Sequence, residues 1–408
     1  MPNDNVNLTT QYEELHWNSS PAWRLPSWAE PLMVVAILMI SMFATRRKNY
    51  RILYTSNHLS GLLDKNVYED EEEESISDYI LLNDHAENWS IDSLNLEKQQ
   101  NSYLCWNVDR FRNKTGRFSR NLQSRIMQKF PFLIEMFYWV ITYGFYRCTA
   151  ILSQAIFSKT GIWNVAQNHG LSILQIEHTS LLSFLWPVSE NEVQQWFMQN
   201  HQYFLTVLNR SYALIHIPGT VGFIGWYYYA AASHDTFATV RRTMTLTNLL
   251  AFTIFVMYPC MPPRLLPREY GFLDSVGRNN SESIWMSGKY VNSLAAMPSM
   301  HFGYAFCIGC TMIYHSGILH RILRSGEAQN SKIWTLLYTI FGIWYPTWIL
   351  ITIVATANHY YLDACVAFIV VIIAFLCNRV LTILLPLEHF LLWVLRMEKP
   401  RPTTGSRY

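Results

Sequence analysis

Seven stretches of the chain are apolar over roughly the length of helix that crosses a bilayer, which is about 20 residues. The first has its apolar part at 31–45 and ends at the basic triplet 46–48. It has no basic n-region and no small-residue cleavage site, so it predicts a membrane anchor and not a cleaved signal. The expected fold is therefore all-α: a polytopic membrane bundle with a six-helix core and one N-terminal transmembrane helix. The expected spans are 27–45, 131–157, 203–230, 244–260, 300–319, 333–355 and 360–386.

Two segments between these spans have a different character. Residues 46–130 contain the acidic run 69–74 and no long apolar stretch, which is typical of an exposed, partly disordered linker. Residues 158–200 are mixed, and 164–186 predicts an amphipathic helix or hairpin at the membrane surface or between spans. The expected domains are a non-cytosolic segment 1–26, an anchor 27–45, an acidic cytosolic linker 46–130, a transmembrane domain 131–386 and a basic cytosolic tail 387–408.

Composition agrees with a membrane protein. Of the 408 residues 15% are charged and 50% are hydrophobic, whereas soluble chains are about 25% charged. The net charge of +2 excludes bulk electrostatic nucleic-acid binding as the default, and the aromatic content of 15% excludes a mainly disordered chain. The seven cysteines are odd in number and show no disulfide framework. Cys307 and Cys310 lie in an apolar helix, where packing is the expected role.

The distribution of basic residues predicts the topology. With the N-terminus outside, 22 Lys and Arg face the cytosol and six face the other side. Sequons at Asn7, Asn18 and Asn279 fall outside, but those at Asn88 and Asn113 fall inside, so sequons alone do not decide. The outer loop 261–297 carries four basic residues against the trend, as a phosphate site requires; ordinary solvated charge is the alternative.

Three short segments at that outer face contain residues suited to chemistry. They are 262–267 (PPRLLP), 297–301 (MPSMH) and 358–363 (NHYYLD). A spacing of four puts His359 and Asp363 on one helix face, where the carboxylate can hold one imidazole nitrogen and leave the other free as a nucleophile or base. Ionisable residues at a membrane are costly and are functional by default.

The other two segments suit the binding of a phosphate. Ser299 opens a helix, where free amides attract an anion, although simple capping is the alternative. His301, within the first turn, is placed to donate a proton to a departing oxygen. Arg264 lies on a stiff proline-bounded turn, and its guanidinium fork fits phosphate oxygens. Together these residues fit phosphoryl transfer through a phosphohistidine. No carboxylate cluster suggests a metal, and no cofactor is expected.

The Pro-Ser-x-His and His-x-x-x-Asp segments, in this order on successive spans, resemble the type 2 phosphatidic acid phosphatase (PAP2) superfamily. The PPRLL and AMPSMH versions look like its branch of inositolphosphotransferases, which includes inositol phosphorylceramide synthase. The resemblance covers about 131–386, with weaker echoes at Ile176-Glu177, at Tyr212 with His216, and at Arg241-Arg242.

The resemblance implies a role for each site residue and a six-helix bundle that needs no metal. His359 is the nucleophile that attacks phosphorus, and Asp363 orients it. His301 protonates the leaving group and then activates the acceptor. Arg264 and Ser299 hold the phosphate oxygens.

Two positions depart from the phosphatase pattern. Met257 stands where the pattern has a Lys, and Ile353 stands where it has an Arg. Lipid phosphotransferases of the sphingolipid type also lack that Arg, so its absence favours transfer to an alcohol; a weakened activity is the alternative. Arg147 and Arg210 are candidate auxiliary cations, and pairing with Glu177 or snorkelling to headgroups is equally compatible with their positions.

The resulting prediction is a metal-independent membrane enzyme that moves a phosphoryl headgroup, inositol phosphate in the resembling branch, to a lipid alcohol. The alternatives are a lipid phosphate phosphatase and, in another class, a non-catalytic scaffold or transporter subunit. The expected partners are membrane lipids, a phospholipid donor and a ceramide acceptor, with no nucleic acid; an accessory subunit stays open. The family suggests an endomembrane, Golgi or ER, with the site on the lumenal or exterior face.

Overall fold

The computed structural model describes residues 28–48, 50, 52, 118–157, 161–179, 184, 186–275, 294–318 and 331–405. The predicted segment 1–26, the acidic run 69–74, most of the linker and the five sequons named above lie outside these residues. Across the described ranges the protein is all-helical, as predicted, and contains no strand; one isolated bridge joins Cys260 and Ala295.

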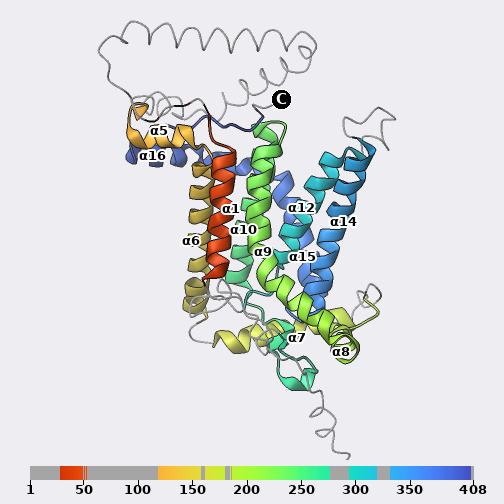
Figure 1. The fold of residues 1–408 in the computed structure, drawn as a ribbon. Coiled ribbons are helices and arrows are strands. Elements are labelled where there is room, and N and C mark those ends of the chain that lie inside the picture. Colours follow the sequence, from red (N-terminus) through yellow and green to blue (C-terminus); the bar gives the residue numbers. More distant parts are fainter. Residues whose placement is uncertain are drawn as a thin grey trace, which may run out of the picture. The chain divides into compact units, whose positions relative to one another are not determined.

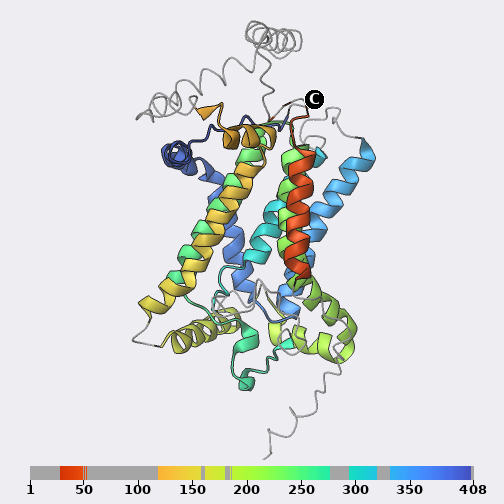
Figure 2. The same ribbon diagram turned by 60° about the vertical axis from the view of Figure 1, so that its left-hand side comes forward.

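The described chain divides into two compact units. The first comprises 1–45, 132–381 and 402–408, and the second comprises 46–131 and 382–401. In the first unit long helices run side by side, and α7 and α8 lie at one end of them (Figures 1 and 2). Its helices are α1 (Ala29–Ala44), α6 (Leu133–Ile156), α7 (Ile162–Thr179), α8 (Glu190–Asn200), α9 (Gln202–Ala230), α10 (His234–Met257), α12 (Met300–Ser316), α14 (Lys332–Ala355) and α15 (Tyr361–Leu376).

Helix α10 begins ten residues before the predicted span at 244, so the segment 231–243 between two expected spans is mostly helix. Ser233 caps the helix by accepting a hydrogen bond from the amide of Thr236 at 3.2 Å. Arg241, just before the expected span, lies within the helix and pairs with the buried Glu135 of α6 at 2.7 Å. A buried carboxylate needs such a partner, and this pairing allows the polar first turns to pack.

The last predicted span is also corrected. Helix α15 ends at Leu376, ten residues before the expected 386, and is followed by the 3₁₀ helix Asn378–Leu384 and by α16 (Leu385–Val394). The apolar composition continues through this break, so hydropathy alone does not reveal where the helix ends.

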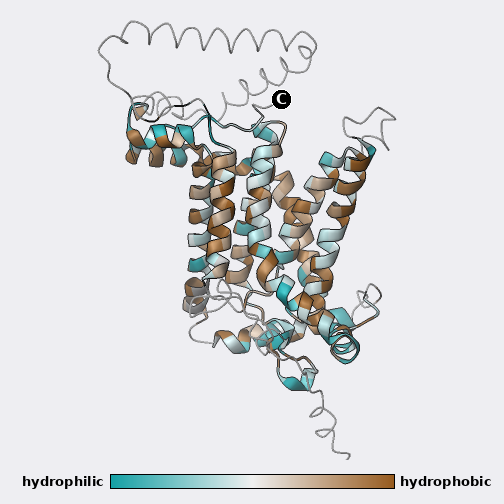
Figure 3. Cartoon of the chain, in the orientation of Figure 1, coloured by the Kyte–Doolittle hydropathy of each residue, from teal (hydrophilic) through white to brown (hydrophobic). Residues whose placement is uncertain are grey.

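Helix α14 is, among the described helices, the one that is long and apolar enough to cross a membrane by itself. Helix α15 passes the same test only when combined with 378–394, across the break, and the apolar part of α1, Pro31–Ala44, is shorter. Hydrophobic residues nevertheless occur along all the long helices (Figure 3). Many of the large apolar side chains on α14 point outward; the exposed ones include Ile333, Trp334, Leu336, Ile340, Ile343 and Trp344.

The second unit contains α5 (Leu122–Lys129) and α16 in its described part. Side chains of α5 bind the main chain that follows α16. Asn121 donates to the carbonyl of Arg396 at 2.9 Å, and Ser124 accepts from the amide of Glu398 at 2.9 Å. These contacts hold 395–401 against α5.

Candidate active site

Main-chain hydrogen bonds bring the three motif segments together. The amide of Arg264 donates to the carbonyl of Ala357 at 2.9 Å, which joins 262–267 to the turn before His359. The amide of Ser299 donates to the carbonyl of Asp363 at 3.1 Å, which joins the start of α12 to the start of α15. The predicted convergence of these segments is therefore a feature of the fold.

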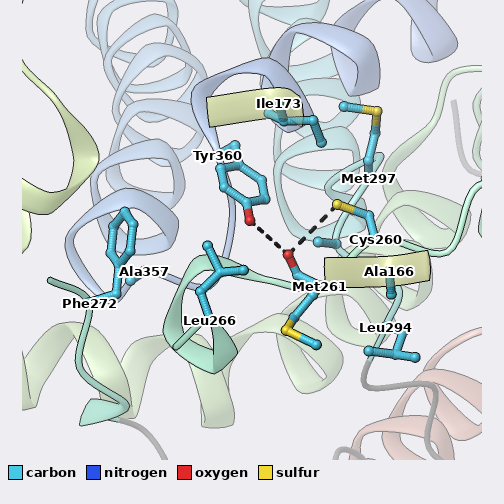
Figure 4. Close-up of a cluster of buried hydrophobic side chains, with 11 residues drawn as sticks. Ala166, Ile173, Cys260, Met261, Leu266, Phe272, Leu294, Met297, Ala357 and Tyr360 are labelled. Carbon is cyan, nitrogen blue, oxygen red and sulfur yellow. Dashed lines mark hydrogen bonds between the residues drawn. The ribbon is translucent and has the colours of Figure 1, made fainter. Parts of the chain in front are cut away.

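A cluster of buried apolar side chains underlies this meeting point (Figure 4). Tyr360 is fully buried in it and donates its hydroxyl to the carbonyl of Met261 at 2.8 Å. Gly170 of α7 permits this contact, because a Cβ there would lie 2.6 Å from the Tyr360 hydroxyl and 3.0 Å from the Met261 carbonyl. The other members shown are Ala166, Ile173, Cys260, Leu266, Phe272, Leu294, Met297 and Ala357.

The chain reaches His359 through a tight turn after α14. Ala357 is fully buried with φ +53°, a left-handed conformation that costs a non-glycine residue roughly 1 kcal/mol or more. The amides of Asn358 and His359 both donate to the carbonyl of Ile353, at 3.0 and 3.2 Å. This turn directs the His359 side chain inward, where 5% of the residue remains exposed.

The two nitrogens of His359 have different surroundings. Nδ1 lies 2.8 Å from the carbonyl oxygen of Ala296 and 3.3 Å from Oδ2 of Asp363. Because a carbonyl only accepts, Nδ1 carries the proton in the neutral ring, and the lone pair is on Nε2. Nε2 is buried without a hydrogen-bond partner among the described residues. Nε2 is therefore the nitrogen of this ring that is able to act as a base or a nucleophile.

Asp363 is fixed by a second contact. Its Oδ2 also accepts from the amide of Tyr360 at 3.0 Å, and none of the residue is exposed. The carboxylate therefore caps its own helix while facing the imidazole, as the spacing of four predicts.

His301 lies beside His359, with ring centroids 5.9 Å apart. Its ring stacks on Tyr212 and contacts His216, both of α9, each with its centroid 4.0 Å away. These two residues were noted in the sequence only as weak echoes. These ring contacts fix the imidazole plane of His301 next to His359.

The residues expected to bind phosphate meet the same site. Arg264 is 11% exposed; its Nη1 pairs with Oδ1 of Asp274 at 2.9 Å, and its Nε is buried without a partner among the described residues. Ser299 is fully buried, and its Oγ accepts from the amide of Phe302 at 3.4 Å. The hydroxyl proton of Ser299 stays available to an anion.

The auxiliary cations and the departing positions lie as follows. Arg147 of α6 lies over the ring of Tyr143, 5.9 Å from its centroid, and Arg210 lies on α9. Met257 is 69% exposed at the end of α10, and Ile353 is fully buried in α14. The two departures therefore affect the site unequally: Ile353 touches it through its carbonyl, whereas the Met257 side chain points outward.

Further contacts at the site come from Gln194 and Glu190, which the sequence analysis did not single out, and from Glu177, which it noted as a weak echo. Gln194 of α8 binds both main-chain groups of Leu273, and Glu190 opens α8 with its carboxyl buried. Glu177 accepts from the amide of Leu362 at 2.6 Å. Burial, and then the neighbouring carboxyl of Glu190, raise the pKa of Glu177 from 4.5 to about 10, so Glu177 holds a proton at neutral pH. The one sequence signal for these contacts was Glu177, a glutamate in a predicted amphipathic helix.

The described residues contain no group of three or more His, Cys, Asp or Glu side chains suited to hold a metal ion. Searches of curated proteins and of solved structures gave no significant match. A family model for the PAP2 superfamily, whose members are typically phosphatases or phosphotransferases, matches residues 173–325, a segment that holds Arg264, Ser299 and His301 and ends before His359.

Proposed function

We propose that the protein is a membrane lipid phosphotransferase that moves a phosphoryl headgroup, inositol phosphate by the sequence resemblance, to a lipid alcohol such as ceramide. In this proposal His359 is the nucleophile, Asp363 orients it, and His301 is the general acid and base. Arg264 and Ser299 bind the phosphate oxygens. The family match supports phosphatase or phosphotransferase chemistry on lipid phosphates in general.

The observation that carries the proposal is the state of His359. Its Nδ1 proton is held by two acceptors, and its Nε2 lone pair is buried with no partner in the described part of the chain. An unsatisfied buried nitrogen costs stability unless a ligand uses it. The unpartnered Nε of Arg264 gives the same site a buried donor for an anion.

The proposed reaction has two displacements at phosphorus. Nε2 of His359 attacks, an N–P bond forms, and the P–O bond to the diacylglycerol oxygen breaks while His301 gives that oxygen a proton. The alcohol of the acceptor then attacks phosphorus, His301 takes its proton, and the N–P bond breaks. Asp363 stabilises the positive charge that develops on the imidazole in the first step.

We propose that the first unit spans the membrane several times. The outward apolar side chains of α14 and the other long helices support this, because water-exposed surfaces rarely hold so many. The distribution of basic residues supports a lumenal or exterior site, and the family resemblance supports an endomembrane, Golgi or ER. A glycan acceptor inserted in 276–293 should be modified, whereas one inserted in 66–80 should not. The reverse pattern overturns this topology.

The function is tested with purified protein in detergent and phosphatidylinositol labelled in its headgroup, with and without ceramide. We expect label to move to ceramide in the wild-type protein and not in His359→Ala. His201→Ala is the matched control, because His201 is exposed and lies outside the site. Water-dependent release of inositol phosphate without transfer would instead show a hydrolase. If His359→Ala still forms either product at the wild-type rate, the mechanism is excluded and a non-catalytic role of His359 is favoured.

A further inference from the structure

Three successive main-chain amides at the start of α15 each donate a hydrogen bond to a carboxyl oxygen. The amide of Tyr360 donates to Asp363, as described above. The amide of Tyr361 donates to Oε1 of Glu190 at 3.2 Å, and that of Leu362 donates to Oε1 of Glu177 at 2.6 Å. Helix N-termini have free amides, but these are usually capped by a local side chain or by water. Here two caps come from elements more than 170 residues away in sequence.

These two carboxyl groups are buried at a high cost. Glu177 is 1% exposed and Glu190 is not exposed at all. Carboxyl groups are rarely buried unless they are paired, because they lose hydration. The positive end of the α15 dipole and the two donated amides compensate for this loss. Stabilising the start of a helix does not by itself need two distant carboxyl groups, because a single local Ser or Asp can cap the free amides.

Helix α8 contacts the phosphate side of the site as well. Gln194 lies one turn after Glu190, on the same face, and is fully buried. Its Nε2 donates to the carbonyl of Leu273 at 2.8 Å, and its Oε1 accepts from the amide of Leu273 at 3.0 Å. The next residue, Asp274, pairs with Arg264 at 2.9 Å. One face of α8 is therefore connected to the helix of the nucleophile and to the partner of the phosphate-binding arginine.

We propose that Glu177, Glu190 and Gln194 are positioning residues for the active site, with the two glutamates fixing the His359–Asp363 pair through the start of α15 and Gln194 fixing Arg264 through Leu273 and Asp274. This inference rests on the proposed function for its kinetic consequences. The geometry by itself predicts two separate effects. Glu177 and Glu190 affect the chemical step, and Gln194 affects the binding of the phosphate.

The kinetic test compares kcat and KM for headgroup transfer. Glu177→Ala and Glu190→Ala are expected to lower kcat about 10- to 100-fold with little change in KM, the usual range for residues that orient a reacting side chain. Gln194→Ala is expected to raise KM with a smaller loss of kcat. Glu177→Gln should recover most of the activity, because an amide oxygen can still accept from Leu362. A purely structural role would lower the folded fraction and leave both constants unchanged in the remaining enzyme.

Two matched controls lie on the same helix. Glu192→Ala makes the same chemical change as Glu177→Ala at an exposed position, where the carboxylate binds only the amide of Ser189 among the described contacts. Gln195→Ala removes a side chain that binds only its neighbour Asn191 at 2.8 Å among the described contacts. Both are expected to keep wild-type kcat and KM. Equal losses in the controls and in the three tested variants would overturn the proposal.

A readout that needs no turnover separates this inference from the proposed function. Deuterium exchange at the amides of Tyr361 and Leu362 should be slow in the wild type and at least 10-fold faster in Glu177→Ala or Glu190→Ala. Unchanged exchange in both variants refutes the positioning role, whatever reaction the protein catalyses. Faster exchange in a protein that transfers no headgroup keeps the contact and rejects the proposed function instead.

Discussion

Replacing Asp363 with Asn separates two roles that a carboxylate can have beside a catalytic histidine. In a Ser-His-Asp triad the same change lowers kcat about 10⁴-fold, because the histidine adopts the wrong tautomer. In this protein the Nδ1 proton has a second acceptor, the carbonyl of Ala296, and at 2.8 Å this contact is shorter than the 3.3 Å to Asp363. The tautomer should therefore survive the substitution.

What Asp363→Asn removes is the charge that stabilises a positive imidazole. At 3.3 Å and an effective dielectric constant of about 20, a full charge pair is worth about 5 kcal/mol. A transition state with roughly half of that charge developed loses about 2.5 kcal/mol, which slows the reaction about 10²-fold. We expect a loss of 10²- to 10³-fold in the rate of phosphoenzyme formation.

The assay is a rapid-quench measurement of label bound to the purified variant, with Asp235→Asn as the control because Asp235 is an exposed carboxylate of α10. A loss of about 10⁴-fold or more would mean that Asp363 sets the tautomer and that the Ala296 contact does not. A loss below tenfold would mean that the carboxylate contributes no charge stabilisation. Either result refutes the reasoning from the two distances.

Four further predictions test other parts of the site. His301→Ala should slow the release of the leaving group by about 10²–10⁴-fold in single-turnover kinetics. Arg264→Lys should not restore the activity lost in Arg264→Ala, because an ammonium does not reproduce a two-pronged contact; equal rates for Lys and wild type would contradict this. Gly170→Ala should lower the melting temperature and the activity, by about 1–3 kcal/mol of overpacking against Tyr360. The pKa of Glu177 is raised from 4.5 to about 10, so between these pH values the folded state keeps a proton that the unfolded chain releases. The free energy of unfolding should therefore fall as pH rises, by at most about 1.4 kcal/mol per pH unit. Melting temperatures measured at pH 6–9 should depend less steeply on pH in Glu177→Gln than in the wild type.

Several long helices could be predicted because their apolar runs are long and distinct. The predicted spans at 131–157, 203–230 and 333–355 correspond closely to α6, α9 and α14. The predicted helix ends are wrong where a helix continues through polar residues. Helix α10 extends through Arg241 because Glu135 of another helix neutralises it, and such a long-range partner is invisible to a local pattern.

The sequence could predict the candidate residues of the site, but it could not predict how their side chains are oriented. The spacing of four in His359 and Asp363 survives as a direct contact. The acceptor that fixes the tautomer is a main-chain carbonyl, that of Ala296, and any residue type could supply it. Glu190 and Gln194 act across more than 70 residues of sequence, so only the fold shows what they bind.

The central claim is that His359 forms a covalent bond to phosphorus, and it is tested most directly by trapping that species. Purified protein is mixed with phosphatidylinositol labelled at phosphorus, quenched within one turnover, digested and analysed by mass spectrometry. A phosphorus–nitrogen bond to histidine is labile in acid and stable in base, which distinguishes it from a phosphoserine. We expect the label on the peptide that contains His359, discharged by added ceramide and absent from His359→Ala. Turnover by the wild-type protein without label on that peptide, or unchanged labelling of His359→Ala, would contradict the account.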